Sequence, residues 1–289
     1  MRQVFLGSPW IHAPADPDIV RLFNTCGRWA KLPAGGCIFN GGDRGEIALV
    51  LSGLGAFSFQ DRHGRNHIFT LILPGRLMGD VDGLSGSTVN VTDAALRETE
   101  VRLLSRDLFL QFLSENPSIQ RKHAVGIIAD HESDMEGMIA NFTLSAPDRI
   151  ITLFASLIHN LRLEPDSEGF YPLENSLTTI EISQIVSVAR PTVSAILNQW
   201  LAEGLLKKVD KHLCVSHALF AALQDWTHRG ATPAAKIRKR RHRRVMSAVE
   251  RRASSSQRLQ KQTAEANCWD VFLTSLNLPP TKIQSLCRG

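Results

Sequence analysis

The chain has 289 residues, 43% of them hydrophobic, and this length suffices for roughly two folded domains. Its apolar runs fall well short of the ~20 residues of a membrane span, and its five scattered cysteines form no CxxC pair. We therefore expect a soluble cytoplasmic protein with no membrane partner, disulfide framework or metal site. The net charge of +5 is divided unevenly, because residues 231–289 contain 13 Lys and Arg against 3 Asp and Glu, whereas residues 1–230 are acidic overall.

Short β-like runs separated by glycine fill the segment from Arg28 to about Ser105. Polar and apolar residues alternate from Ala56 to Gln60, and the sequence QDRHGRN follows where a hairpin loop would join two strands. Many short strands with regularly spaced turns are typical of a small barrel or jelly roll. We expect a β-roll domain over residues 1–115.

A helical region follows, from Asp107 to Leu113 and then, after Asn116 and Pro117 as N-cap and first helical residue, to about Leu144. One narrow apolar stripe recurs in the long helix at spacings of three and four: Ala124, Ile128, His131, Met135, Met138 and Phe142. Such a heptad-like stripe favours a partner helix, which makes residues 116–145 a candidate dimerisation helix. The alternative is that the stripe packs on the chain's own β-roll. We expect His131 to be a packed residue rather than a ligand.

Residues 146–230 begin with an amphipathic helix and a polar loop, RLEPDSEGFYPLENS. Thr178 and Thr179 are capping candidates for a helix whose apolar face is Ile182, Ile185 and Val186. A turn centred on Val188 leads to a second helix with Val193, Ile196, Leu197 and Trp200 facing inward and Gly204 at its end. This spacing is that of a helix-turn-helix, and LLKKVDKHLCVS predicts a two-stranded wing turning at Asp210 and Lys211. An ordinary helical hairpin is the alternative.

The order of these segments resembles the Crp-Fnr superfamily of bacterial transcription regulators over about Arg28 to Trp226. The matching motifs are LPAG at 32–35, GD at 42–43, LVLSG at 49–53, LPG at 73–75, GD at 79–80 and IEISQIVSVARPTVSAILNQWLAEGLL at 180–206. The resemblance implies an α+β chain with an N-terminal jelly-roll-like β-roll, a long dimerisation helix and a C-terminal winged helix-turn-helix at 146–230. It implies a homodimer that binds double-stranded DNA at an inverted-repeat operator, with RNA polymerase as a further candidate partner.

The resemblance also places the candidate DNA-binding residues. Arg190 falls where the family commonly has a base-reading arginine, and its guanidinium suits O6 and N7 of guanine. Pro191 and Ala195 stand where better-known members have base-contacting residues, so the operator of those members does not carry over. The remaining candidates are polar or cationic: Thr178, Thr179, Thr192, Ser194 and Asn198 on the helices, and Lys207, Lys208 and Lys211 for phosphates.

The ligand pocket of the family is degenerate in this chain. Gly79 and Asp80 stand where cyclic-nucleotide-binding members have Gly and Glu, and Leu77 to Leu96 contains no Lys or Arg to hold a phosphate. We therefore expect no cyclic nucleotide as a cofactor. Only Cys26 and Cys37 lie near the N-terminus, too few for a four-cysteine iron-sulfur cluster, and ten scattered histidines identify no haem ligand.

The basic extension at 231–289 predicts either added sequence-independent DNA affinity or a solvated tail. No catalytic motif is present, so we expect no enzyme and no catalytic residues. The rival to a DNA-binding regulator is a dimeric sensory or scaffold protein that uses its β-roll without reading DNA.

Overall fold

The structure, a computed structural model, describes residues 8–40, 45–80, 91–173, 177–210 and 212–221. All of them belong to one structural unit. The predicted basic extension at 231–289, Lys211 and residues 81–90 of the expected strand segment lie outside the described residues.

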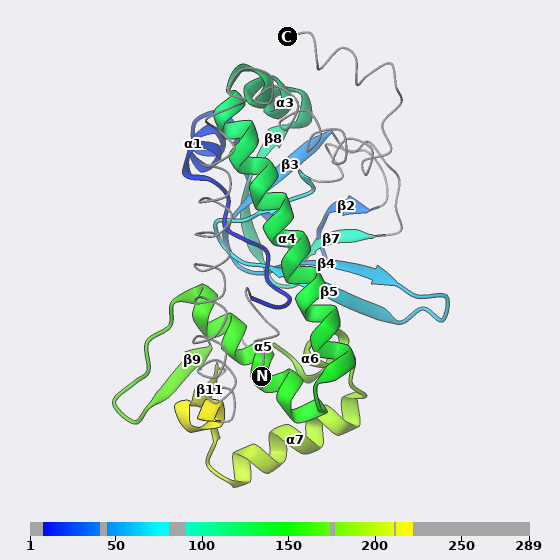
Figure 1. Cartoon of the computed structure of the whole chain (residues 1–289), viewed down its shortest axis with the longest axis vertical. Coiled ribbons are helices and arrows are strands. Elements are labelled where there is room, and N and C mark those ends of the chain that lie inside the picture. Colours follow the sequence, from blue (N-terminus) through cyan, green and yellow to red (C-terminus); the bar gives the residue numbers. More distant parts are fainter. Residues whose placement is uncertain (1–7, 41–44, 81–90, 174–176, 211, 222–289) are drawn as a thin grey trace, which may run out of the picture. The chain divides into compact units, whose positions relative to one another are not determined.

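The N-terminal part is built on two antiparallel sheets of four strands each, in the orders β1-β8-β3-β6 and β2-β7-β4-β5 (Figure 1). The strands are β1 (Arg28–Leu32), β2 (Cys37–Asn40), β3 (Glu46–Ser52), β4 (Gly55–Gln60), β5 (Asn66–Ile72), β6 (Leu77–Met78), β7 (Thr92–Ala95) and β8 (Thr99–Ser105). Ile38, Ile72, Val50 and Val101 come from both sheets and pack into one buried cluster. This shared core confirms the predicted β-roll, and β4 and β5 form the predicted hairpin.

A second cluster covers the outer side of the β1-β8-β3-β6 sheet. It joins Ile19 and Phe23 of α1 (Pro17–Cys26) to Phe109 of α3 (Arg106–Glu115) and to strand residues of β3 and β8. The rings of Phe23 and Phe109 lie 5.9 Å apart between centroids. The sequence reading missed α1, although Asp16 caps its first turn and Pro17 begins it.

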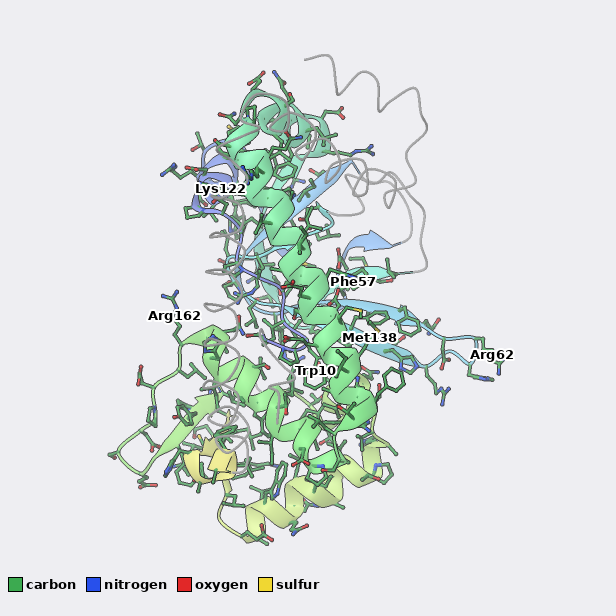
Figure 2. All side chains as sticks on the ribbon, in the orientation of Figure 1. Trp10, Phe57, Arg62, Lys122, Met138 and Arg162 are labelled. Carbon is green, nitrogen blue, oxygen red and sulfur yellow. The ribbon has the colours of Figure 1, made fainter. Side chains whose placement is uncertain are left out.

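The N-terminal segment at 8–13 lies between β5 and the long helix α4 (Pro117–Thr143). Ile11 forms a parallel bridge with Leu71, whose amide donates to the carbonyl of Trp10 at 2.8 Å. The Ser133 hydroxyl of α4 donates to the carbonyl of Ser8 at 2.6 Å. Trp10 is 1% exposed and lies against α4 (Figure 2), so this segment is part of the core rather than a tail.

The start and end of α4 agree with the prediction, since it begins at Pro117 after Asn116 and ends at Thr143. Asn116 occupies the N-cap position, but its side-chain amide donates to the carbonyl of Phe112 in α3 and makes no capping bond. Among the described residues no single helix is long and apolar enough to span a membrane; α6 (Thr179–Ile185) and α7 (Arg190–Ala202) meet that test only together, with a 116° bend between them.

The C-terminal part packs α5 (Ala146–Leu161), α6 and α7 over a three-stranded antiparallel sheet in the order β10-β11-β9. The remaining elements are β9 (Phe170–Leu173), β10 (Leu206–Val209), β11 (His212–Ser216) and the short 3-10 helix η1 (His217–Phe220). The two predicted strands are joined by β9, which lies in the segment that the sequence reading described as a polar loop. That reading was wrong at Phe170–Leu173, because β11 pairs with β9 as well as with β10.

Candidate functional site

The second predicted helix of the candidate DNA-binding region has one buried and one open face. Val193 and Trp200 are 0% and 7% exposed and pack in the core, with Ile196 and Leu197 partly buried beside them. On the opposite face Arg190, Pro191, Thr192 and Asn198 are exposed, and Ser194 is partly buried. Ala189, the N-cap residue, makes no side-chain capping bond. The helix therefore presents an arginine, a threonine and an asparagine outward from its first three turns.

The preceding helix is held at its start by a reciprocal cap. The amide of Glu181 donates to the Thr178 hydroxyl at 3.2 Å, and the amide of Thr178 donates to the Glu181 carboxylate at 2.7 Å. Thr178 is thus occupied as a cap although its side chain is exposed, and Thr179 is partly buried in the first turn.

The turn between α6 and α7 is fixed by side chains from two other helices. Asn141 of α4 donates to the carbonyl of Ile185 at 3.1 Å, and Arg149 of α5 donates to the carbonyl of Val186 at 3.2 Å. Ser187 takes a left-handed backbone conformation with φ of 50°. These bonds satisfy carbonyls at the end of α6 and hold the turn on which the direction of α7 depends.

The lysines predicted to contact phosphates are placed differently from one another. The ammonium of Lys207 donates to Asp166 at 3.0 Å and to Glu168 at 2.8 Å, and it lies 4.1 Å from the centroid of the Phe170 ring. Its bond to Glu168, with that to Asp166, raises the pKa of Lys207. Lys208 is exposed on the next position of β10. Lys208 is therefore the better placed of the two for a phosphate.

The predicted dimerisation stripe is uncovered in the single chain. Phe142 is 86% exposed, and Ile128, Met135 and Met138 are 36–47% exposed; His131 is exposed and Ala124 is partly exposed. Other residues of α4, Ser133, Gly137 and Ala140 among them, are buried against the rest of the chain. The stripe thus does not pack on the chain's own β-roll.

The degenerate ligand position is acidic and buried. Asp80 and Asp93 are 7% and 4% exposed, and the amide of Gly79 donates to the Asp93 carboxylate at 2.7 Å. Nε2 of His123 on α4 lies 3.6 Å from the Asp80 carboxylate. Burial lowers the pKa of His123, and this effect outweighs the negative charge of Asp80, which raises it. Two buried carboxylates in this place do not fit the phosphate of a cyclic nucleotide.

A second polar cluster, which the sequence reading missed, joins α4 to the N-terminal segment. Asp130 accepts from the amide of Ala13, and Asp134 accepts from the Thr70 hydroxyl. Burial raises the pKa of both carboxyls, that of Asp130 to about 6. Nearby, Arg76 donates to the carbonyl of His12 at 2.6 Å, and burial lowers the pKa of Arg76 to about 10.

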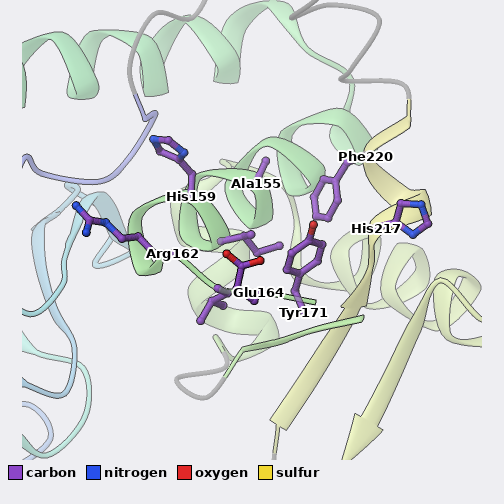
Figure 3. Close-up of a pocket in the computed structure, with 9 residues that line it drawn as sticks. Ala155, His159, Arg162, Glu164, Tyr171, His217 and Phe220 are labelled. Carbon is purple, nitrogen blue, oxygen red and sulfur yellow. The ribbon is translucent and has the colours of Figure 1, made fainter. Parts of the chain in front are cut away.

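A cavity of about 610 Å³ opens between α5, β9 and η1 (Figure 3). Its wall mixes aromatic, imidazole and charged side chains: Tyr171, Phe220, His159, His217, Arg162 and Glu164, with Ala155, Ile158 and Leu163. Within the described ranges, no group of three or more His, Cys, Asp or Glu side chains is arranged to hold a metal ion.

Comparison with known proteins bears on both halves of this arrangement. Residues 29–116 match the family model of the cyclic nucleotide-binding domain. The cyclic AMP receptor protein of Thermus thermophilus is 26% identical over 203 residues, which are 70% of this chain and 89% of that protein. Together these matches support a Crp-Fnr superfamily transcription regulator of bacterial origin.

Two further proteins are similar to most of this chain. The CRP-like cAMP-activated global transcriptional regulator of Mycobacterium tuberculosis is 23% identical over 188 residues, 64% of this chain and 82% of that protein. The solved structure of FixK2 from Bradyrhizobium japonicum has a TM-score of 0.59 at 20% identity and covers 72% of this chain and 99% of that one. The second comparison shows a shared fold.

Proposed function

We propose that this protein is a sequence-specific DNA-binding regulator that acts as a homodimer, with α6 and α7 as a helix-turn-helix and α7 in the major groove. The observation that carries the proposal is the exposed Arg190 at the first position of α7, on a helix whose other face is anchored by Val193 and Trp200. A guanidinium there suits the paired acceptors of guanine, and such a contact contributes about 1–3 kcal/mol of discrimination.

The homodimer is supported by the uncovered apolar stripe on α4. Phe142 alone is 86% exposed, and four apolar side chains of the stripe lie at heptad-like spacing, which suits a second copy of the same helix. A two-fold axis along the paired helices would place the two Arg190 side chains on half-sites about one DNA turn apart, ~34 Å, in an inverted repeat. RNA polymerase is a further proposed partner, and the proposed place of action is the cytoplasm.

We further propose that DNA binding does not depend on a cyclic nucleotide, and that the protein has no catalytic activity of its own. The buried carboxylates of Asp80 and Asp93 support the independence from a cyclic nucleotide, since no Lys or Arg occurs between Leu77 and Leu96 to balance an added phosphate. Calorimetric titration with cyclic AMP and cyclic GMP tests it, with absence of heat expected; saturable binding of either nucleotide would overturn it.

Selection of bound sequences from a random DNA pool tests the main proposal. The purified chain is compared with a variant that lacks residues 231–289, at near-physiological salt because phosphate contacts depend strongly on ionic strength. We expect the same inverted repeat from both proteins. If no motif is enriched and DNA binding is lost when residues 231–289 are removed, the protein is better interpreted as a dimeric scaffold or sensor that does not read DNA.

Two substitutions separate base reading from phosphate binding. Arg190→Ala is expected to relax the preference at one base position in each half-site, whereas Lys208→Ala is expected to weaken binding to all sequences alike and to reduce the salt dependence. Equal losses on every sequence for Arg190→Ala would refute its role in reading a base.

A further inference from the structure

Arg97 lies in the turn between β7 and β8, whose backbone is fixed by hydrogen bonds. The buried Thr99 hydroxyl donates to the carbonyl of Arg97 at 2.9 Å and lies 3.3 Å from that of Leu54, and the amide of Leu54 donates to this hydroxyl at 3.2 Å. Gly53, with φ of 93°, leaves no room for a Cβ beside Glu98 and Thr99. The backbone that carries Arg97 is therefore pinned to the turn between β3 and β4.

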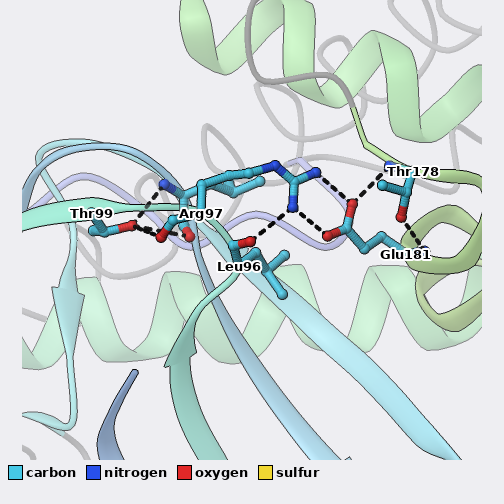
Figure 4. A network of polar contacts seen from close by, with 6 residues as sticks. Leu96, Arg97, Thr99, Thr178 and Glu181 are labelled. Atoms are coloured by element: carbon cyan, nitrogen blue, oxygen red, sulfur yellow. Dashed lines mark hydrogen bonds and ion pairs between the residues drawn. The ribbon is translucent and has the colours of Figure 1, made fainter. Parts of the chain in front are cut away.

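From this turn Arg97 reaches the first turn of α6 (Figure 4). Its Nη1 donates to Glu181 Oε1 at 2.5 Å and its Nη2 donates to Oε2 at 2.7 Å, a bidentate pair of the strong kind. Nη1 also donates to the carbonyl of Leu96 at 2.8 Å, which sets the direction of the guanidinium. The two side chains are 29% and 12% exposed, so solvent screens this pair less than a surface pair.

Glu181 is at the same time the capping residue of α6, because its Oε2 accepts from the amide of Thr178 at 2.7 Å. Burial raises the pKa of Glu181, but the bonds from Arg97 and Thr178 outweigh burial and hold that pKa below its usual value. The carboxylate thus stays charged and joins the β-roll to the start of the helix pair.

The position of α6 determines where α7 points. Ile182 and Ile185 of α6 and Val193 of α7 are at most 1% exposed in one cluster, and the turn between the helices is four residues long. A shift of α6 against the β-roll therefore moves Arg190 with it.

We propose that Arg97 is a positioning residue for DNA readout, which acts through Glu181 to hold the helix pair at one orientation against the β-roll and so sets the half-site spacing that the dimer accepts. The inference rests on the proposed function for its DNA readout. Loss of the pair should let α7 adopt several orientations, so that operators with one base pair more or less between the half-sites are bound almost as well as the best one.

The test uses the full chain in three single variants and in one double variant that combines the first two. Arg97→Ala removes both hydrogen bonds to the Glu181 carboxylate. Glu181→Gln removes the charge but keeps a side-chain oxygen to accept from Thr178, so the capping box survives. Lys31→Ala is the matched control, because Lys31 pairs with Glu98 of the same turn at 2.7 Å but stays within the β-roll. Each is assayed for affinity across operators of varied half-site spacing and for amide hydrogen exchange without DNA.

We expect the preference for the best spacing to fall about tenfold, equivalent to 1.4 kcal/mol, in Arg97→Ala and in Glu181→Gln, with no further fall when both are combined. Exchange in α6 should become faster in the same variants while β8 is unchanged, and Lys31→Ala should match the unaltered chain. The proposal is overturned if Arg97→Ala keeps the original spacing preference, if it loses affinity equally at all spacings, or if the two effects add.

If the unaltered chain selects no inverted repeat, the proposed function is wrong. Hydrogen exchange then decides separately whether the Arg97–Glu181 ion pair, here called the clamp, holds α6 in place. In that case faster exchange of α6 in both clamp variants, and not in Lys31→Ala, would support the Arg97 to Glu181 clamp, and unchanged exchange would overturn it.

Discussion

The two glycines of α4 provide a sharp test of the packing between the N-terminal segment and the helix. A Cβ added at Gly137 would lie 2.6 Å from Cδ1 and 2.7 Å from Nε1 of Trp10, whereas one at Gly126 would meet nothing within 4 Å. Alanine in place of glycine stabilises a helix interior by up to ~1 kcal/mol at either position. At Gly137 the ring is 1% exposed and cannot turn aside, so overpacking of about 3 kcal/mol outweighs that gain.

We therefore expect Gly137→Ala to lower the free energy of unfolding by about 2 kcal/mol, or about 4–8 °C in Tm, and Gly126→Ala to raise it slightly. The measurement is thermal and urea unfolding at one fixed protein concentration, because the stability of a dimer depends on concentration. Trp10→Leu should partly rescue Gly137→Ala, since a smaller side chain relieves the contact. If Gly137→Ala is as stable as Gly126→Ala, the burial of Trp10 against α4 is refuted.

Two further predictions concern α4. The folded pKa of Asp130, about 6, lies above its ordinary value of 3.8, so the folded chain binds more protons between these values and stability falls as pH rises through about 4 to 6. Asp130→Asn should reduce this fall, to which the raised pKa of Asp134 also contributes. It should stabilise the chain at pH 7.5 by up to about 3 kcal/mol, less the interaction that Arg76 loses with the carboxylate. Urea unfolding at pH 4.5 and 7.5 measures both effects, and an unchanged pH slope would contradict the assignment. Phe142→Ser should weaken the proposed dimer at least about tenfold while the fold of each chain is kept, because the ring is almost fully exposed. Sedimentation equilibrium measures the dimer affinity, and an unaltered affinity would place the interface elsewhere.

Local signals were enough to predict α4 and the helix pair. Asn116 and Pro117 mark the start of α4, and Ser187 to Ala189 and Gly204 mark the bounds of α7, because caps and left-handed positions depend on residues next to each other. The strand β9 could not be found in this way. Phe170–Leu173 is short and contains Pro172, and its pairing partner β11 lies about forty residues further along the chain.

In the candidate site, too, some features could be predicted from local sequence and others could not. The outward position of Arg190 follows from helical periodicity, which the sequence contains. The partners of Lys207, of Arg97 and of Asp130 do not, since Asp166, Glu181 and Ala13 are 41, 84 and 117 positions away. Long-range ion pairs form only when packing brings distant segments together, and no local pattern indicates which charges will meet.

Among the described residues, the sheet order β10-β11-β9 leaves β10 and β9 as the edges of the C-terminal sheet. An open edge invites pairing with a strand of another molecule, and charged residues and proline are the usual protection. Pro172 interrupts the donors of β9, and Lys207 and Lys208 stand on β10 beside Val209, which is 47% exposed. The lysines on β10 therefore also oppose edge-to-edge aggregation. Lys208→Gln removes the charge that would contact a phosphate but keeps a polar side chain on this edge, so weaker DNA binding without aggregation in this variant would indicate a lost phosphate contact.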